Sequence, residues 1–246
     1  MAPEVIVAGV AIAFLAATCQ SVTGFGFALT MTPLLALAWD VKPTIATSIL
    51  LGLLILFPLL AEVRGSVSVG RVSGMLLGFL FGAIPGIILV ERLDEDALRV
   101  MVAATVILAS VSLYFSPRIA SGEDSIPMRL VAGALSGAIG TSTSLGGPPI
   151  VLYLLGRERD MPSFRATIMA FFLPAGAVTL LAFILVGQVT RDVLVMSAAA
   201  LPGIAAGILF GAWLRRRLDP ERFRAIVLAI LVATSVAALV GSAARL

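Results

Sequence analysis

Long apolar stretches follow one another along this chain, and each has about the length of a membrane-crossing helix. A hydrocarbon core of about 30 Å requires roughly 20 apolar residues in a helix. The pattern predicts eight apolar segments separated by short polar connections. They fall near residues 4–38, 44–62, 70–90, 97–115, 128–156, 166–186, 193–214 and 222–242. We therefore expect an all-α, polytopic membrane protein.

The first and fifth segments differ from the others because each contains a polar, glycine-rich break. Residues 20–33 read Q-S-V-T-G-F-G-F-A-L-T-M-T-P, and residues 141–149 read T-S-T-S-L-G-G-P-P. Unwound backbone within a membrane is tolerated where it is buried in protein or lines a cavity, and paired breaks are typical of transporter substrate sites. Both segments are predicted to be broken helices or to re-enter the membrane from one side.

The segments form two sets of four that repeat each other in sequence. Leu93-Asp94 recurs as Leu218-Asp219, 125 positions later. The same spacing maps a glycine ladder in the third segment onto one in the seventh, pairing Gly78, Gly82 and Gly86 with Gly203, Gly207 and Gly211. Matches that keep their order along the chain indicate an internal duplication.

The predicted organisation is an N-terminal repeat at 1–116, a polar linker at 117–127 and a C-terminal repeat at 128–246. The repeats are parallel if each broken segment crosses the membrane, and inverted if each re-enters. Both arrangements leave one side richer in lysine and arginine, so both stay open at this point.

Composition limits the function further. The chain of 246 residues is 60% hydrophobic and 13% charged, with a mean hydropathy of +1.11. It has no histidine and one cysteine, so imidazole metal sites and an internal disulfide framework are not expected. The net charge of +3 comes from cations spread thinly over short loops, which argues against nucleic acid as a partner. We predict no metal and no cofactor.

Polar side chains gather at the two breaks and are candidates for contacts with a substrate. Hydroxyls, an amide and backbone N–H groups without carboxylates suit a small anion. The helix that begins near Pro148 is expected to direct N–H groups and the positive end of its dipole at the break. The predicted substrate-binding residues are Gln20, Ser21, Thr23, Gly24 and Gly26 in the first break, and Thr141, Ser142, Thr143, Ser144, Gly146, Gly147 and Pro148 in the second.

Two cations complete the predicted site. Lys42 and Arg165 each lie just before the second segment of a half, and we hypothesise that they attract the anion. No carboxylate lies in the interior of a segment, so a relay of protons through Asp or Glu is not visible. This leaves facilitated diffusion, or a proton carried on the substrate itself.

The sequences S-V-T-G-F-G-F-A-L-T-M-T-P-L-L and G-T-S-T-S-L-G-G-P-P-I-V-L-Y-L-L resemble the two repeat signatures of the TauE/SafE sulfite exporter family. The duplicated eight-segment plan is similar to that family, part of the 4-toluene sulfonate uptake permease-like superfamily, over nearly the whole chain. This chain has Gly24-Phe25-Gly26-Phe27-Ala28 where the family's commoner first signature has G-x-G-G-G. The resemblance implies an exporter or permease for sulfite, organosulfonates or related small anions in a prokaryotic plasma membrane.

Two other functions compete with a transporter. An anion channel would use the breaks as a selectivity constriction, and a subunit of a membrane assembly would use the glycine seams to bind partner helices. An intramembrane enzyme is disfavoured because a serine nucleophile would have neither a histidine nor a buried lysine as its base. The expected partners are a small anion and the lipid bilayer, with a homo-oligomer left as an option.

Overall fold

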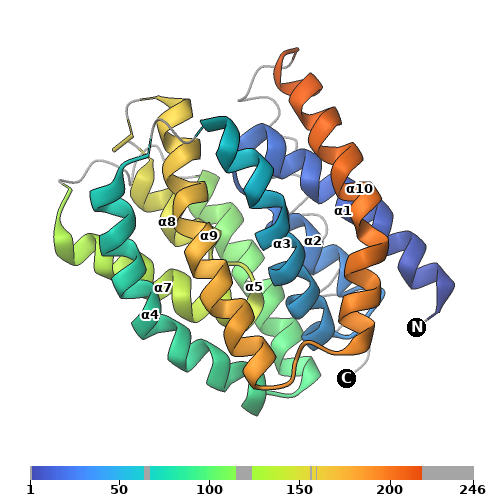
Figure 1. Cartoon of the computed structure of the whole chain (residues 1–246). Helices are drawn as coiled ribbons and strands as arrows, with labels where there is room; N and C mark the ends of the chain where they lie inside the picture. Colours follow the sequence, from blue (N-terminus) through green and yellow to red (C-terminus); the bar gives the residue numbers. More distant parts are fainter. Residues whose placement is uncertain (1, 64–66, 115–123, 156, 159, 218–246) are drawn as a thin grey trace.

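The protein is helical throughout the part of the chain that its structure describes (Figure 1). The computed structural model describes residues 2–63, 67–114, 124–155, 157–158 and 160–217. The helices are α1 (Pro3–Thr23), α2 (Phe27–Leu35), α3 (Val41–Val63), α4 (Val69–Arg92), α5 (Glu95–Tyr114), α7 (Ile126–Thr143), α8 (Gly147–Leu154), α9 (Met161–Leu185) and α10 (Arg191–Arg215). The predicted segment at 222–242 lies outside the described residues.

Within these residues, five helices are long and apolar enough to cross a membrane, namely α1, α3, α4, α9 and α10. Their outward faces carry large apolar side chains such as Phe81 and Leu209, which are 72% and 73% exposed. Soluble proteins rarely expose so much apolar surface, whereas lipid tails accept it. The prediction of an all-α, multi-pass membrane protein is confirmed.

Polar caps set the starts of two long helices. The carboxylate Oδ1 of Asp160 accepts a hydrogen bond from the backbone N–H of Ser163 at 2.7 Å, and Pro162 occupies the first turn of α9. The Thr190 hydroxyl accepts from the N–H of Val193 at 3.4 Å at the start of α10. Both caps satisfy N–H groups that a helix cannot satisfy itself, so each helix has a defined first turn.

Two seams of small residues join the halves of the chain. A Cβ atom added at Gly78, Gly82 or Gly86 of α4 would lie closer than 3.0 Å to backbone atoms or a side chain of α7. Helix α10 meets α1 in the same way, because a Cβ at Gly207 would lie 2.5 Å from the carbonyl oxygen of Phe14. Only glycine lets two helix backbones approach so closely. The ladders predicted from sequence are therefore packing surfaces.

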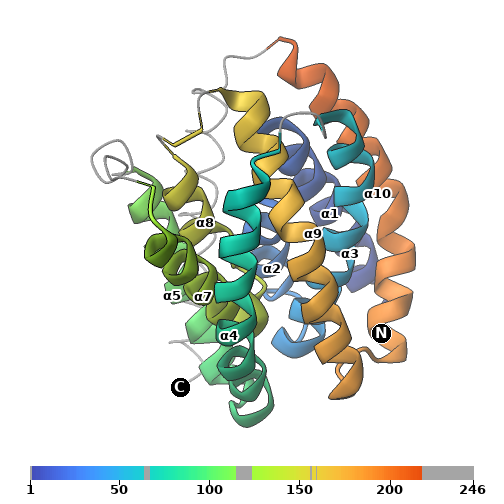
Figure 2. The same cartoon turned by 60° about the vertical axis from the view of Figure 1, so that its left-hand side comes forward.

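Four of the long helices stand in a row with the order α4, α9, α3 and α10, and Figures 1 and 2 show this row from two sides. Helix α7 packs on α4 at one end of the row, and α1 packs on α10 at the other. The first helix of each half is thus paired with the third long helix of the other half. Helices α3 and α9, one from each half, meet at the centre.

Helices at corresponding positions in the two halves run in opposite directions. In Figure 1, α3 rises while α9 descends, and α4 descends while α10 rises. The backbone N–H of Ser68, just before α4, donates to the Thr167 hydroxyl near the start of α9 at 3.1 Å. The beginning of α4 therefore lies beside the beginning of α9, and these two helices run in the same direction.

A cluster of charged and polar side chains ties α4, α7 and α8 together at one end of the molecule. Asp124 accepts hydrogen bonds from Arg71 at 3.0 Å and from Arg129 at 2.9 Å, and also from the Tyr153 hydroxyl. Arg71 forms a second ion pair with Glu158 at 2.9 Å. Asp124 precedes α7 and Glu158 follows α8, so the cluster fixes both ends of this pair of helices to the start of α4.

We expect Asp124→Asn to lower the thermal midpoint of the detergent-solubilised protein near pH 7. The pKa of the Asp124 carboxyl is well below its usual range, and hydrogen bonds from Arg129 are the main cause. Desolvation of the carboxyl has the opposite, smaller effect. A depressed pKa contributes stability above about pH 4 that is lost as the pH falls further. Each partly exposed ion pair adds at most about 1 kcal/mol to the free energy of unfolding. The loss of one such pair lowers the thermal midpoint by roughly 2–4 °C in a protein of this size.

The measurement is a thermal melt of both proteins across acidic and neutral pH, with the exposed Asp96→Asn as a matched control. The difference between the Asp124→Asn and parent midpoints should shrink progressively as the pH falls below about 4. Equal midpoints for the two proteins at neutral pH would show that the cluster adds no stability.

Candidate anion site

The first break lies between α1 and α2 and is held open by Gln20. Gly24 and Gly26 have φ values of 85° and 102°, a left-handed conformation that glycine adopts without strain. The Gln20 amide Nε2 donates to the Gly24 carbonyl at 3.1 Å, and its Oε1 accepts from the Phe27 N–H at 3.0 Å. One buried side chain thus satisfies backbone groups on both sides of the break.

The second break lies between α7 and α8 and is tied to helices of both halves. Ser144 has a φ of 65°, and the Ser136 hydroxyl donates to the Gly146 carbonyl at 2.7 Å. The Ser144 hydroxyl lies 2.5 Å from that of Thr32 in α2, which donates to Ser48 Oγ in α3 at 2.8 Å. A chain of hydroxyls therefore links the second break to the helix that follows the first.

Both breaks open onto one cavity of about 110 Å³. It lies beside the middle of α3, at Ser48 to Leu56, and the middle of α9, at Phe172 to Thr179. The residues at the breaks that line it include Gln20, Phe25, Gly26, Ser144, Leu145, Gly146 and Gly147. The cavity therefore lies at mid-height of two helices that are long and apolar enough to cross a membrane.

The first residues of two helices face this cavity. Gly26, Phe27, Ala28 and Leu29 at the start of α2 line it, as do Gly146 and Gly147 at the start of α8. The first four N–H groups of a helix have no partner inside the helix, and the helix dipole makes this end partially positive. The cavity therefore receives positive potential from both halves of the chain.

The backbone N–H donors at the cavity come more from α2 than from α8, whereas the sequence predicted them at the helix that begins near Pro148. Helix α8 begins at Gly147, and Pro148 and Pro149 occupy its next two positions. Proline has no N–H, so two of the four otherwise unpartnered donors are missing there. At α2 one donor is used by Gln20, and the N–H groups of Ala28 and Leu29 remain in the first turn.

Several hydroxyls of the predicted site donate hydrogen bonds to backbone carbonyls. Ser142 donates to Ala138 O and Thr143 to Ile139 O, each at 2.7 Å and one turn back along α7. The predicted residues outside the cavity lining are Ser21, Thr23, Gly24, Thr141, Ser142, Thr143 and Pro148. Their polar groups shape the breaks and the helix seams, and they do not line the cavity.

Three hydroxyl-bearing residues that the sequence analysis missed do line the cavity: Ser48, Ser136 and Thr179. Ser48 shares a face of α3 with Gly52 and Leu56, and Thr179 shares a face of α9 with Phe172 and Gly176. Neighbours three or four residues apart share one face of a helix. Small or polar residues on these otherwise apolar faces were the signal available in the sequence. The sequence pattern does not show that these helix faces turn toward the breaks.

Arg165 and Lys42 lie outside the cavity lining. The Arg165 guanidinium donates to the Ser21 carbonyl at 3.0 Å, and Arg215 donates to the same oxygen at 3.2 Å. Cations suit the last carbonyls of a helix, so both arginines stabilise the end of α1 at the first break. Lys42 stands in the first turn of α3, where its backbone N–H donates to Glu95.

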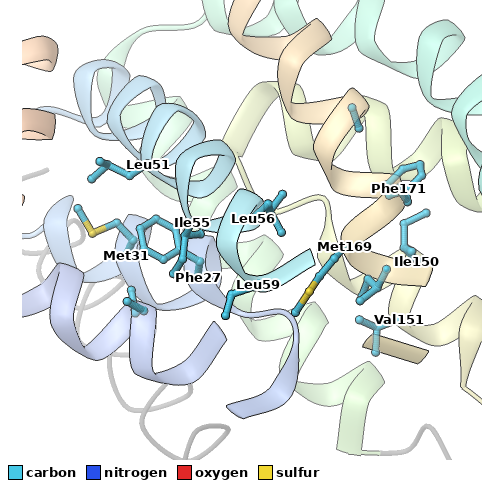
Figure 3. Close-up of a cluster of buried hydrophobic side chains, with 14 of the residues drawn as sticks. Phe27, Met31, Leu51, Ile55, Leu56, Leu59, Ile150, Val151, Met169 and Phe171 are labelled. Carbon is cyan, nitrogen blue, oxygen red and sulfur yellow. The ribbon is translucent and has the colours of Figure 1, made fainter. Parts of the chain in front are cut away.

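Apolar packing fixes each short helix to a long one, and Figure 3 shows the two contacts. Phe27 and Met31 of α2 lie toward Leu51 and Ile55 of α3 on one side. On the other side, residues of α8 lie toward residues of α9. These are Ile150 and Val151 of α8 with Met169 and Phe171 of α9. All of these side chains are buried, so α2 is held against α3 and α8 is held against α9.

A protein-family comparison decides what this architecture belongs to. The model of the sulfite exporter TauE/SafE family matches residues 9–238, which is nearly the whole chain. The chain is a member of the TauE/SafE family. This confirms the resemblance that the two glycine-rich signatures indicated. The family is one of membrane exporters, which is not a class of enzymes.

One curated relative gives the same assignment. The chain is 20% identical over 219 residues to a protein of Cupriavidus necator described as a probable sulfite/organosulfonate exporter TauE, covering 87% of this chain and 85% of that protein. No solved structure matches the chain significantly. Among the described residues, no group of three or more metal-ligating side chains comes together.

Proposed function

We propose that this chain transports sulfite, organosulfonates or related small anions, and that it holds the anion in the cavity between the two breaks. The observation that carries the proposal is the convergence of two helix starts on one cavity at the middle of α3 and α9. Partially positive helix ends and hydroxyl donors favour a negative solute there. The exporter name of the family and of the curated relative supports this substrate class.

We further propose that the two halves are inverted repeats and that they move relative to each other to alternate access. The opposite directions of α3 and α9 support inversion, as do the equivalent seams of α4 with α7 and α1 with α10. Because α2 packs on α3 and α8 packs on α9, a shift of the central pair would displace both helix starts. A prokaryotic plasma membrane is the expected location.

The test is anion flux into liposomes that contain the purified protein alone. We expect saturable uptake of sulfite and methanesulfonate, and acceleration of labelled anion by unlabelled anion on the opposite side. Flux that rises linearly with concentration and shows no such counterflow would identify a channel. No flux above that of protein-free liposomes would favour a subunit of a larger assembly.

For Arg165, we propose attraction of the anion from outside the cavity lining. At an effective dielectric constant of about 20, a charge about 10 Å away is worth about 1–2 kcal/mol. We therefore expect Arg165→Gln to raise the apparent KM by about fivefold or more. Arg165→Lys is the matched control, because it retains the charge but loses the planar group that reaches Ser21. An unchanged KM in Arg165→Gln would remove this residue from substrate attraction.

A further inference from the structure

The side chains that line the cavity are uncharged, as far as the described residues show. Polar groups come from Gln20, Ser48, Ser136, Ser144 and Thr179. The remaining surface is apolar and includes the aromatic rings of Phe25, Phe27, Phe79 and Phe172. A solute in this cavity would therefore exchange water for neutral hydrogen-bond donors and a largely apolar wall.

Two positive charges, Arg165 and Arg215, lie at the end of α1 beside the first break. Both guanidinium groups bond to the Ser21 carbonyl on α1, and neither side chain lines the cavity. Arg165 is buried and Arg215 is partly exposed. Because both bond to the end of α1 outside the lining, an anion in the cavity depends mainly on neutral donors.

The cost of moving an ion out of water rises with the square of its charge. The free energy of desolvation of a doubly charged anion is therefore roughly four times that of a singly charged anion of the same size. Its attraction to neutral donors and helix dipoles rises only in proportion to the charge. A cavity with these donors can accept a monoanion and still reject a dianion.

Size and shape suit a small organic monoanion. A cavity of about 110 Å³ accepts a solute of a few heavy atoms. A sulfonate with one methyl group would place its oxygens at the donors and its methyl group against the aromatic wall.

We infer that the cavity admits singly charged anions and excludes doubly charged ones, so that sulfite crosses as hydrogen sulfite. This inference rests on the proposed transport function and specifies its substrate class. Sulfite exchanges its last proton near neutral pH, so both forms are present in cells. The transported form carries one proton and one negative charge, and the protein itself needs no proton relay.

Methanesulfonate and methylphosphonate provide a matched pair of probes, because they have nearly the same shape. Methanesulfonate carries one charge at any physiological pH, whereas methylphosphonate gains a second charge between mildly acidic and mildly alkaline pH. Flux into liposomes would be measured with the same pH on both sides. We expect methanesulfonate flux to stay constant and methylphosphonate flux to fall by at least about tenfold with the second ionisation. Sulfate should not be transported at either pH.

Methanesulfonate reports any effect of pH on the protein itself, so the ratio of the two fluxes isolates the charge of the solute. Equal methylphosphonate flux at both pH values would overturn the inference and leave the transport function intact, as would sulfate flux that equals methanesulfonate flux. Absence of flux for every anion, methanesulfonate and sulfite included, would overturn the transport function together with the inference.

Discussion

Gly147→Leu should abolish anion flux while leaving a folded protein in the membrane. Gly147 lines the cavity at the first position of α8, and a Cβ added there would meet no other heavy atom within 4 Å. The leucine side chain would therefore enter open space inside the cavity and occupy the volume that an anion needs. Helix α8 should tolerate leucine, which has a higher helix propensity than glycine.

The measurements are flux into liposomes and the thermal midpoint in detergent. We expect flux at the level of protein-free liposomes and a midpoint close to that of the parent. Gly147→Ala is the matched control, and its single methyl group should leave measurable flux. Normal flux through Gly147→Leu would mean that the substrate does not pass this point.

Gly82→Ala should be among the most destabilising single substitutions in the protein. A Cβ at this position would overlap the backbone carbonyl of Ala134 in α7, and the overlapping atom cannot move aside like a side-chain tip. The two helices would have to separate along their whole seam. Overpacking of this kind costs about 3 kcal/mol or more, which corresponds to a fall of roughly 6–12 °C in thermal midpoint.

Gly70→Ala is the matched control, because it lies on the same ladder of α4 but has nothing within 4 Å of the added atom. Its thermal midpoint should stay near the parent value. Gly207→Ala in the seam between α10 and α1 should behave like Gly82→Ala. Midpoints for Gly82→Ala and Gly70→Ala that do not differ would show that the α4–α7 seam can adjust.

The helices were predictable from sequence because the signal that places them is local. Runs of apolar residues gave the long helices within a few residues of their ends. Left-handed glycines in the first break and prolines in the second marked where the ladder of backbone hydrogen bonds stops. The residue types at Gly24, Gly26 and Pro148 therefore explain why the helices are interrupted at these positions.

The lining of the cavity was less predictable, because it depends on which side chains turn toward it. Ser142 and Thr143 look like donors in the sequence, but a hydroxyl on a helix can bond to the carbonyl one turn earlier, and these two do so. Ser48 and Thr179 belong to α3 and α9, far from either break in the sequence. Their place in the cavity follows from the packing of the two halves, which no single segment encodes.

The exchanged seams have a consequence for the folding of the chain. Helix α1 fits the groove of α10, and α7 fits the groove of α4, so each half supplies the surface that the other needs. The partner of α4 is made only after α4 itself, and α1 meets α10 only when synthesis has passed α10. Neither glycine groove can therefore close within the N-terminal half alone, and the helices of that half must wait in the membrane for their partners.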